Sequence, residues 1–178
     1  LMSACGGVSV TSDWDSSIDF ASMRSYAWQP GAAIPDGVDQ ISDGRIKGAV
    51  ESSLNAKGLR KVDASQADLI LGYQVTTEDE TTYTTMNTGW GGGYGMGGVR
   101  YGGGMAMGTS TTTANTYTNG TLIIGMFQPS DKALVWHGSG TAKLQESQTP
   151  EERTQRINQA VEKIMETLKE ASEGSMKG

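Results

Sequence analysis

Apolar residues recur at helical spacing in the first third of the chain. Within residues 39–56, three aliphatic residues lie four positions apart, namely Ile46, Val50 and Leu54. Such a repeat places them on one face of a helix, and Lys57 followed by Gly58 supplies a C-terminal stop signal. Gly44 and Gly48 weaken this helix, and they either allow close packing on a sheet or mark a frayed first half. The pattern predicts a first helix over residues 39–56.

The C-terminal segment carries a stronger helical pattern. Thr149 suits the N-cap, Pro150 suits the first helical position, and Glu152 completes a capping box with Thr149. One apolar stripe follows, formed by Ile157, Ala160, Val161, Ile164, Met165 and Leu168. A helix of this kind is marginal alone, so we expect residues 150–172 to pack on a sheet.

Strand patterns occupy most of the sequence between the two helices and before the first. Residues 8–11 alternate as at the start of a strand, and RSYAWQP (24–30) places its two aromatic residues on one face. Residues 67–85 run from an apolar start into threonine-rich sequence, and residues 109–127 run the opposite way. We expect these two long stretches to pair antiparallel, with a glycine-rich segment at their far end.

A further hairpin is predicted after the second long stretch. Residues 122–127 and 133–144 are both strand-like, and the polar turn at 129–132 separates them. Alternation along the second strand places Trp136 on one face and His137 on the other. Trp136 is therefore a core candidate, whereas His137 is expected on the second face as a surface residue.

Together these elements predict an α+β fold. We expect an antiparallel sheet of about five to seven strands, with two helices near 39–57 and 150–172 packed on one face. A long glycine-rich hairpin loop completes the prediction.

Length, charge and cysteine content narrow the class of protein. The 178 residues suit one domain, which we place at residues 6–174, with residues 175–178 as a tail. A net charge of −6 argues against a nucleic-acid or anionic-membrane surface. One cysteine cannot form an internal disulfide. The longest apolar stretch lies within residues 122–127 and is far shorter than the roughly 20 residues of a spanning helix.

That single cysteine, Cys5, follows the small residues Ser3 and Ala4. An aliphatic residue, two small residues and cysteine resemble the end of a bacterial lipoprotein signal peptide, with Met2 where leucine is commoner. Residues 1–5 are therefore expected to hold the end of that signal and a lipidated cysteine. Each buried methylene contributes about 0.8 kcal/mol, so two or three acyl chains would anchor the protein durably. The alternative is a buried or incidental thiol near a frayed terminus.

Taken in order, several segments resemble the bacterial lipoproteins of domain-of-unknown-function family 4136. They are VSVTSDWDSSIDFASMRSYAWQP, RIKGAVESSLNAKGLRKVDASQADLILGYQV, YTNGTLIIGMFQPSDKALVWHGSGTAKL and the closing helix. The resemblance implies a lipid-anchored envelope protein with two helices on an antiparallel sheet, and it brings no catalytic residues. His137 stands where the resemblance leads us to expect arginine. Gly6 rather than aspartate after Cys5 favours the outer membrane, by resemblance to proteobacterial sorting.

Residues 89–108 contain eleven glycines in twenty positions, and they permit two interpretations. A flexible linker between the long strands is favoured, because so much glycine is costly to order. The functional alternative is a contact loop, with Trp90, Tyr94, Val99 and Tyr101 as candidate partner-contact residues. The match to G-x-G-x-x-G within this segment is expected by chance, since neither a buried strand nor a helix flanks it.

Other candidate chemistry is weaker. Met86, Met96, Met105 and Met107 with His137 could suit Cu(I), but the spacing is that of no recognised motif, and apolar filler is the favoured interpretation. The acidic residues at 78–80 lack the spacing of a calcium loop and are expected to be a solvated strand end. We therefore predict no metal and no cofactor.

The leading functional hypothesis is a non-enzymatic envelope lipoprotein, held through Cys5 in the outer membrane facing the periplasm. It would act as a binding or assembly module for an envelope protein or lipid partner, using the open sheet face and the glycine-rich loop. Two alternatives remain. One is a periplasmic hydrolase that uses His137 with an unidentified nucleophile, and the other is a carrier of a lipid or other apolar ligand between helices and sheet.

Overall fold

The computed structural model describes residues 7–87, 110–145 and 148–175. The chain divides into a main unit, which takes the described residues up to Glu78 and from Thr118 onward, and a ribbon unit, Asp79–Tyr117. The strands are β1 (Ser9–Trp14), β2 (Ser25–Trp28), β3 (Arg60–Lys61), β4 (Leu69–Asn87), β5 (Ser110–Phe127) and β6 (Leu134–Lys143). The helices are α1 (Gln40–Ala56), α2 (Pro150–Ser175) and a short 3-10 turn, η1 (Phe20–Ser22).

The strands form one six-stranded sheet in the order β1-β6-β5-β4-β2-β3, so the predicted α+β fold is confirmed. The sheet is mixed rather than wholly antiparallel, which corrects one part of the prediction. β6 pairs antiparallel with β1 and β5, whereas β2 pairs parallel with both β3 and β4. The parallel pairs arise because α1 carries the chain back across the sheet before β3 begins, as a helical crossover does.

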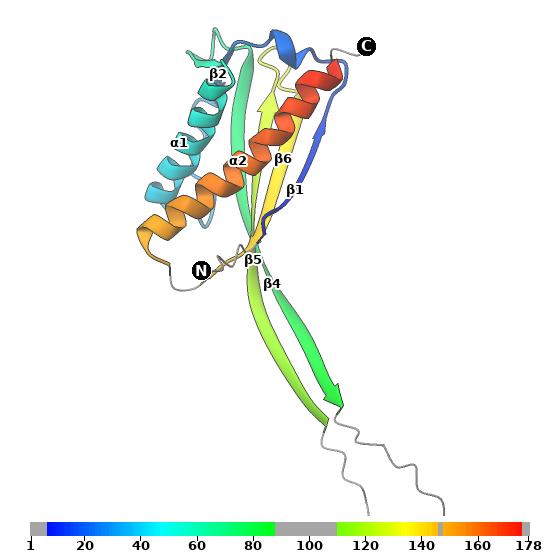
Figure 1. Ribbon diagram of the computed structural model, residues 1–178. Coiled ribbons are helices and arrows are strands. Elements are labelled where there is room, and N and C mark those ends of the chain that lie inside the picture. Colours follow the sequence, from blue (N-terminus) through cyan, green and yellow to red (C-terminus); the bar gives the residue numbers. More distant parts are fainter. Residues whose placement is uncertain (1–6, 88–109, 146–147, 176–178) are drawn as a thin grey trace, which may run out of the picture. The chain divides into compact units, whose positions relative to one another are not determined.

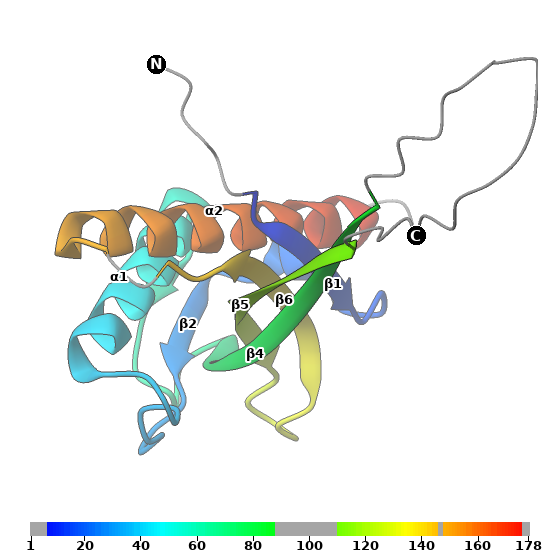
Figure 2. The same ribbon diagram turned by 90° about the horizontal axis from the view of Figure 1, so that it is seen from below.

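Both helices lie on the same face of the sheet (Figures 1 and 2). α2 runs along α1 and covers β6 and β1. The opposite face carries no other element of the main unit (Figure 2). We call it the open face. The main unit therefore has two layers, with a single core between sheet and helices.

The helix ends follow the sequence signals. The Asp39 carboxylate accepts hydrogen bonds from the backbone N–H groups of Ile41 and Ser42, both at 2.9 Å. Gly58 has a positive φ of 89°, which closes α1 after Lys57. At α2 the predicted capping box is confirmed. Thr149 N–H donates to Glu152 at 2.9 Å, and Glu152 N–H donates to Thr149 Oγ1 at 3.2 Å.

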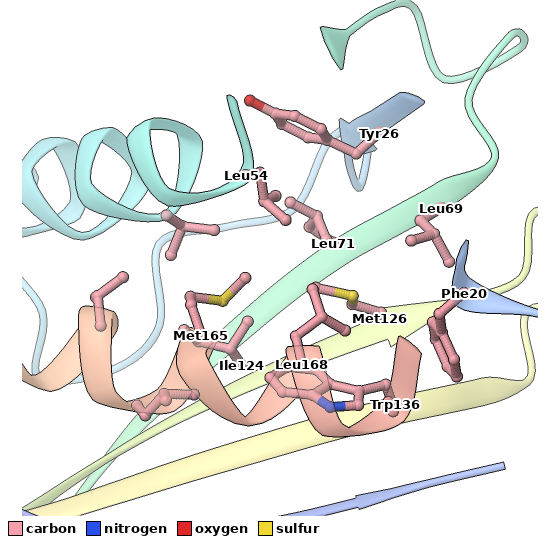
Figure 3. Close-up of a cluster of buried hydrophobic side chains, with 14 of the residues drawn as sticks. Phe20, Tyr26, Leu54, Leu69, Leu71, Ile124, Met126, Trp136, Met165 and Leu168 are labelled. Atoms are coloured by element: carbon pink, nitrogen blue, oxygen red, sulfur yellow. The ribbon is translucent and has the colours of Figure 1, made fainter. Parts of the chain in front are cut away.

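The core lies beneath α2 and α1 (Figure 3). Its largest fully buried side chains include Trp136, Tyr26, Leu54, Leu69, Leu71, Ile124, Met126, Ile164 and Met165. Trp136 is 0 % exposed, as its position in the alternation predicted, and no acceptor for its indole N–H lies among the described residues. Gly138 follows on the same face, and an added Cβ there would lie 2.7 Å from Ile164 Cγ2. This glycine lets α2 approach the strand closely.

Gly44 and Gly48 were predicted either to allow close packing of the helix on a sheet or to mark a frayed first half, and the structure shows no close packing at them. Both are exposed, and an added Cβ at either would meet no atom within 4 Å. They lie within the continuous helix α1, so glycine is required at neither position by its surroundings.

The two edges of the sheet differ in length. β3 contains only two residues, whereas β1 contains six. The N–H of Asp15 donates a hydrogen bond to the carbonyl of Val135, toward β6. Successive N–H groups of a strand point to opposite sides, so the N–H of Trp14 points to the free edge of the sheet. There it donates to the Asp13 carboxylate at 2.9 Å.

Among the described residues, the ribbon unit contains residues 79–87 of β4 and 110–117 of β5. The arrows of these neighbouring strands run in opposite directions (Figure 1). The hydroxyl groups of Thr81 and Thr116 lie 3.1 Å apart and form a cross-strand hydrogen bond, and Tyr83 is exposed. The predicted glycine-rich loop, residues 89–108, lies outside the described residues.

Candidate functional site

Most of the residues singled out from the sequence lie outside the described part of the chain. They are Cys5, the four candidate contact residues Trp90, Tyr94, Val99 and Tyr101, and the methionines Met96, Met105 and Met107. Their predicted roles stay predictions.

His137 lies on the open face of the sheet, as the alternation predicted. It is half-buried, and it pairs in register with Asp13 on β1 and Gly125 on β5. The hydroxyl of Ser139, the next residue on this face, is hydrogen-bonded to Thr11 Oγ1 at 2.8 Å rather than to the imidazole. No group of three or more His, Cys, Asp or Glu residues suited to a metal occurs among the described residues.

A pocket in the main unit combines an apolar floor with a basic rim. It has a volume of about 370 Å³ and lies where η1, the end of α1 and the last third of α2 meet. Its apolar lining is Phe20, Ala21, Met23, Leu59, Leu69 and Leu168. Arg24, Lys57, Lys169 and Ser172 supply the polar lining. We call this the cationic pocket, because three basic residues and no acidic residue line it.

The three basic residues of the cationic pocket come from three separate parts of the chain. The Arg24 guanidinium donates to the carbonyls of Ala21 at 2.6 Å and Met23 at 2.9 Å, so the side chain is held against the η1 segment. Lys57 is the C-cap residue of α1. Lys169 stands on α2, and it forms a loose ion pair with Glu173 at 3.8 Å.

Asp68 fixes the backbone beside Arg24. One of its carboxylate oxygens accepts from Arg24 N–H at 2.9 Å, Ser25 N–H at 3.0 Å and the Ser25 hydroxyl at 2.9 Å. The hydrogen bond from Arg24 N–H, together with those from Ser25, lowers the pKa of Asp68 below its ordinary value, and the Arg24 charge adds to this. The ionised carboxylate therefore joins the start of β2 to the start of β4.

This arrangement predicts a pH-dependent loss of stability. A carboxyl group whose folded pKa is lowered stabilises the fold above its unfolded pKa of about 3.9, and that contribution disappears as pH falls through the folded pKa. The destabilisation caused by Asp68→Asn should therefore be largest near neutral pH and shrink below about pH 4. Urea unfolding of both proteins from pH 7 to pH 2.5 measures it. A difference that stays constant with pH would contradict the prediction.

A second polar cluster joins α1 to the sheet. Tyr73 Oη donates to Asp43 at 2.6 Å, and Lys47 Nζ donates to the other Asp43 oxygen at 3.1 Å. Burial raises the pKa of Asp43, but the bonds from Tyr73 and Lys47 outweigh it and leave the pKa lowered. Burial, followed by the bond to Asp43, raises the pKa of Tyr73. Each group is paired, so this cluster fastens α1 to β4.

The open face carries a second cavity, of about 560 Å³, which we call the open-face hollow. It is lined by Gln29, Pro30, Ala64, Ile70, Phe127, Gln128, Pro129 and Lys132. The Phe127 ring lies across two glycines, since an added Cβ would lie 3.5 Å from it at Gly72 and 3.1 Å at Gly125. Small residues thus let one aromatic ring approach the backbone of the uncovered sheet closely.

Neither cavity was found from the sequence. Arg24, Lys57 and Lys169 belong to segments far apart in the chain, and no local pattern connects them. The packing of η1 against α2, and of α2 against α1, brings them together, which is a tertiary effect. The position of the Phe127 ring is also a tertiary effect. Strand alternation predicts only which face of the sheet Phe127 lies on.

Solved structures show that this fold recurs in other bacterial proteins. A PDZ domain protein from Parabacteroides distasonis has 14% identity and a TM-score of 0.54, over 90% of this chain and 36% of that one. The PelC dodecamer from Paraburkholderia phytofirmans has 12% identity and a TM-score of 0.52, over 91% and 97%. A DUF4136 family protein from Bacteroides thetaiotaomicron has 19% identity and a TM-score of 0.49, over 93% and 97%. At such identities the likeness concerns the fold alone.

The chain spans about a third of the length of the PDZ domain protein and nearly all of the other two. No functionally curated protein matches it. The model of the family described as "Domain of unknown function (DUF4136)" matches residues 10–168, from β1 to the second half of α2. The chain therefore belongs to the DUF4136 family.

Proposed function

We propose that this DUF4136 protein is an envelope lipoprotein held to a membrane by acyl chains on Cys5, and that its body is a non-enzymatic binding or assembly module. The anchor is supported by the order Ser3, Ala4, Cys5, which resembles a lipoprotein cleavage site. No helix among the described residues is long and apolar enough to cross a bilayer.

The observation that carries the binding role is the uncovered face of the sheet. Helices cover one face, while the open face presents the hollow around Ile70 and Phe127. Leu134 lies beside it, half exposed, with its Cδ1 3.3 Å from where a Cβ on Gly125 would lie. Apolar side chains around a hollow are typical of surfaces that contact another molecule.

Assembly of identical copies is the form of binding that one comparison favours. PelC, which shares the fold, is a dodecamer in its crystals. We therefore expect the open face to contact either a second copy of this chain or another envelope protein.

The anchor is tested by expressing the full precursor in a bacterial host. We expect a mass increase that matches acylation and retention in the membrane fraction, and both should disappear in Cys5→Ser. Unmodified protein that leaves the envelope fraction on washing would overturn the anchor.

The contact surface is tested with a photo-crosslinking amino acid at one of two exposed positions. Position 134 lies on the open face and position 41 on the outer side of α1, where Ile41 is 67 % exposed. Crosslinks in intact cells are expected from position 134 only, and a ladder of multiples of the chain mass would identify self-assembly. Equal or absent products at both positions would overturn the open face as the contact surface.

A further inference from the structure

The cationic pocket places a basic rim around an apolar floor in a protein that is acidic as a whole. Acidic residues outnumber basic ones by 20 to 14 in the chain, yet this pocket is lined by three basic residues and no acidic one. Phe20, Leu69 and Leu168 in its floor belong to the buried core. The pocket therefore offers a hydrocarbon environment and positive charge within one cavity.

These two features select one ligand chemistry. The floor excludes water from apolar side chains and favours an alkyl chain, while the ammonium groups of Lys57 and Lys169 and the guanidinium of Arg24 favour an anion. A volume of about 370 Å³ falls in the range of small-molecule sites. Toward other described residues, the Arg24 guanidinium donates its two hydrogen bonds from one nitrogen, Nη1, which leaves its other N–H groups for a ligand.

We propose that the cationic pocket binds a single-chain anionic amphiphile of the fatty-acid class, with the alkyl chain over Phe20 and Leu168 and the carboxylate at Lys57 and Lys169. This deepens the proposed binding function by naming a ligand and a site. It does not depend on the acyl anchor or on the open face, so it can fail or hold separately from them.

The test uses the full chain carrying Cys5→Ser, with laurate as the probe below its micelle-forming concentration. Isothermal titration calorimetry should show saturable binding of one laurate per chain, and dodecyltrimethylammonium, which has the same chain length and opposite charge, should not displace it. Charge reversal by Lys57→Glu or Lys169→Glu should weaken laurate binding by about tenfold or more, because each replaces attraction by repulsion at the carboxylate.

Lys163→Glu is the matched control. Lys163 is exposed on α2 and lies outside the pocket lining. Its substitution by glutamate changes the net charge by the same amount as the two pocket substitutions. We expect its laurate affinity to remain within about twofold of the parent, since screened surface charges at a distance contribute little. Ala21→Trp, which fills the pocket from η1, should abolish binding while thermal unfolding shows that the fold is retained.

Three results would overturn the proposal. The first is no saturable laurate binding, and the second is equal loss in Lys57→Glu and Lys163→Glu. The third is binding to phosphatidylglycerol vesicles that depends on Lys57 without any uptake of laurate, which would indicate docking on a membrane surface instead. If Ala21→Trp does not fold, the laurate affinities of Lys57→Glu and Lys169→Glu, compared with that of Lys163→Glu, test the proposal without it.

Discussion

Trp136→Ala is expected to lower the free energy of unfolding by about 3–5 kcal/mol, the range for a buried large aromatic residue cut back to alanine. The Trp136 side chain is 0 % exposed and lies in the core together with Met126, Ile164 and Leu168. Its removal leaves a cavity that the rigid strand β6 and helix α2 cannot fill. Since whole domains are stable by only about 5–15 kcal/mol, this loss is a large fraction of the total free energy of unfolding.

Chemical denaturation followed by circular dichroism measures this loss. Leu134→Ala on the same strand is the matched control, because Leu134 is 50 % exposed and its truncation should cost less than about 1.5 kcal/mol. Trp136→Phe should cost distinctly less than Trp136→Ala. The phenylalanine ring retains part of the aromatic contacts, and the substitution removes an indole N–H that has no acceptor among the described residues. Equal losses at positions 134 and 136 would show that the core is not centred on this tryptophan.

Gly138→Ala is expected to destabilise the protein by about 1–3 kcal/mol, although alanine usually suits a strand better than glycine. An added Cβ would lie 2.6 Å from Trp136 Cη2 and 2.7 Å from Ile164 Cγ2, distances at which atoms overlap. The indole is fixed by the core, so α2 must move away from β6 and lose its contacts with the strand.

Gly48→Ala provides the opposite result within the same protein. Gly48 lies exposed in α1 with no atom near its missing Cβ, so alanine should stabilise the helix by about 0.5–1 kcal/mol. Urea midpoints of the two variants should therefore shift in opposite directions from the wild type. A Gly138→Ala protein as stable as the wild type would mean that α2 and β6 are not in close contact.

Local patterns were sufficient to predict most elements of this fold. The four-residue spacing of Ile46, Val50 and Leu54 predicted α1, and the capping box at Thr149 and Glu152 predicted where α2 begins. Both succeed because helix periodicity and end-capping are properties of neighbouring residues.

Strand direction was harder to predict. The sequence pattern of β2 suits a parallel or an antiparallel partner equally, and the position of α1 between β2 and β3 was the signal for a parallel crossover. Prediction of the cationic pocket would have required the packed structure itself, because Arg24, Lys57 and Lys169 come together only after α1, α2 and η1 have packed. Sites assembled from distant segments depend on the tertiary fold, so a single sequence does not reveal them.

The edges of the sheet limit how copies of this protein can associate. One margin ends in a strand of two residues, and at the other the Asp13 carboxylate already occupies an outward amide of β1. At these two margins a foreign strand therefore finds either a very short partner or one outward amide that is already satisfied, which disfavours extension of the sheet there. At these margins, copies of this protein are therefore expected to associate through side-chain contacts rather than through an added strand.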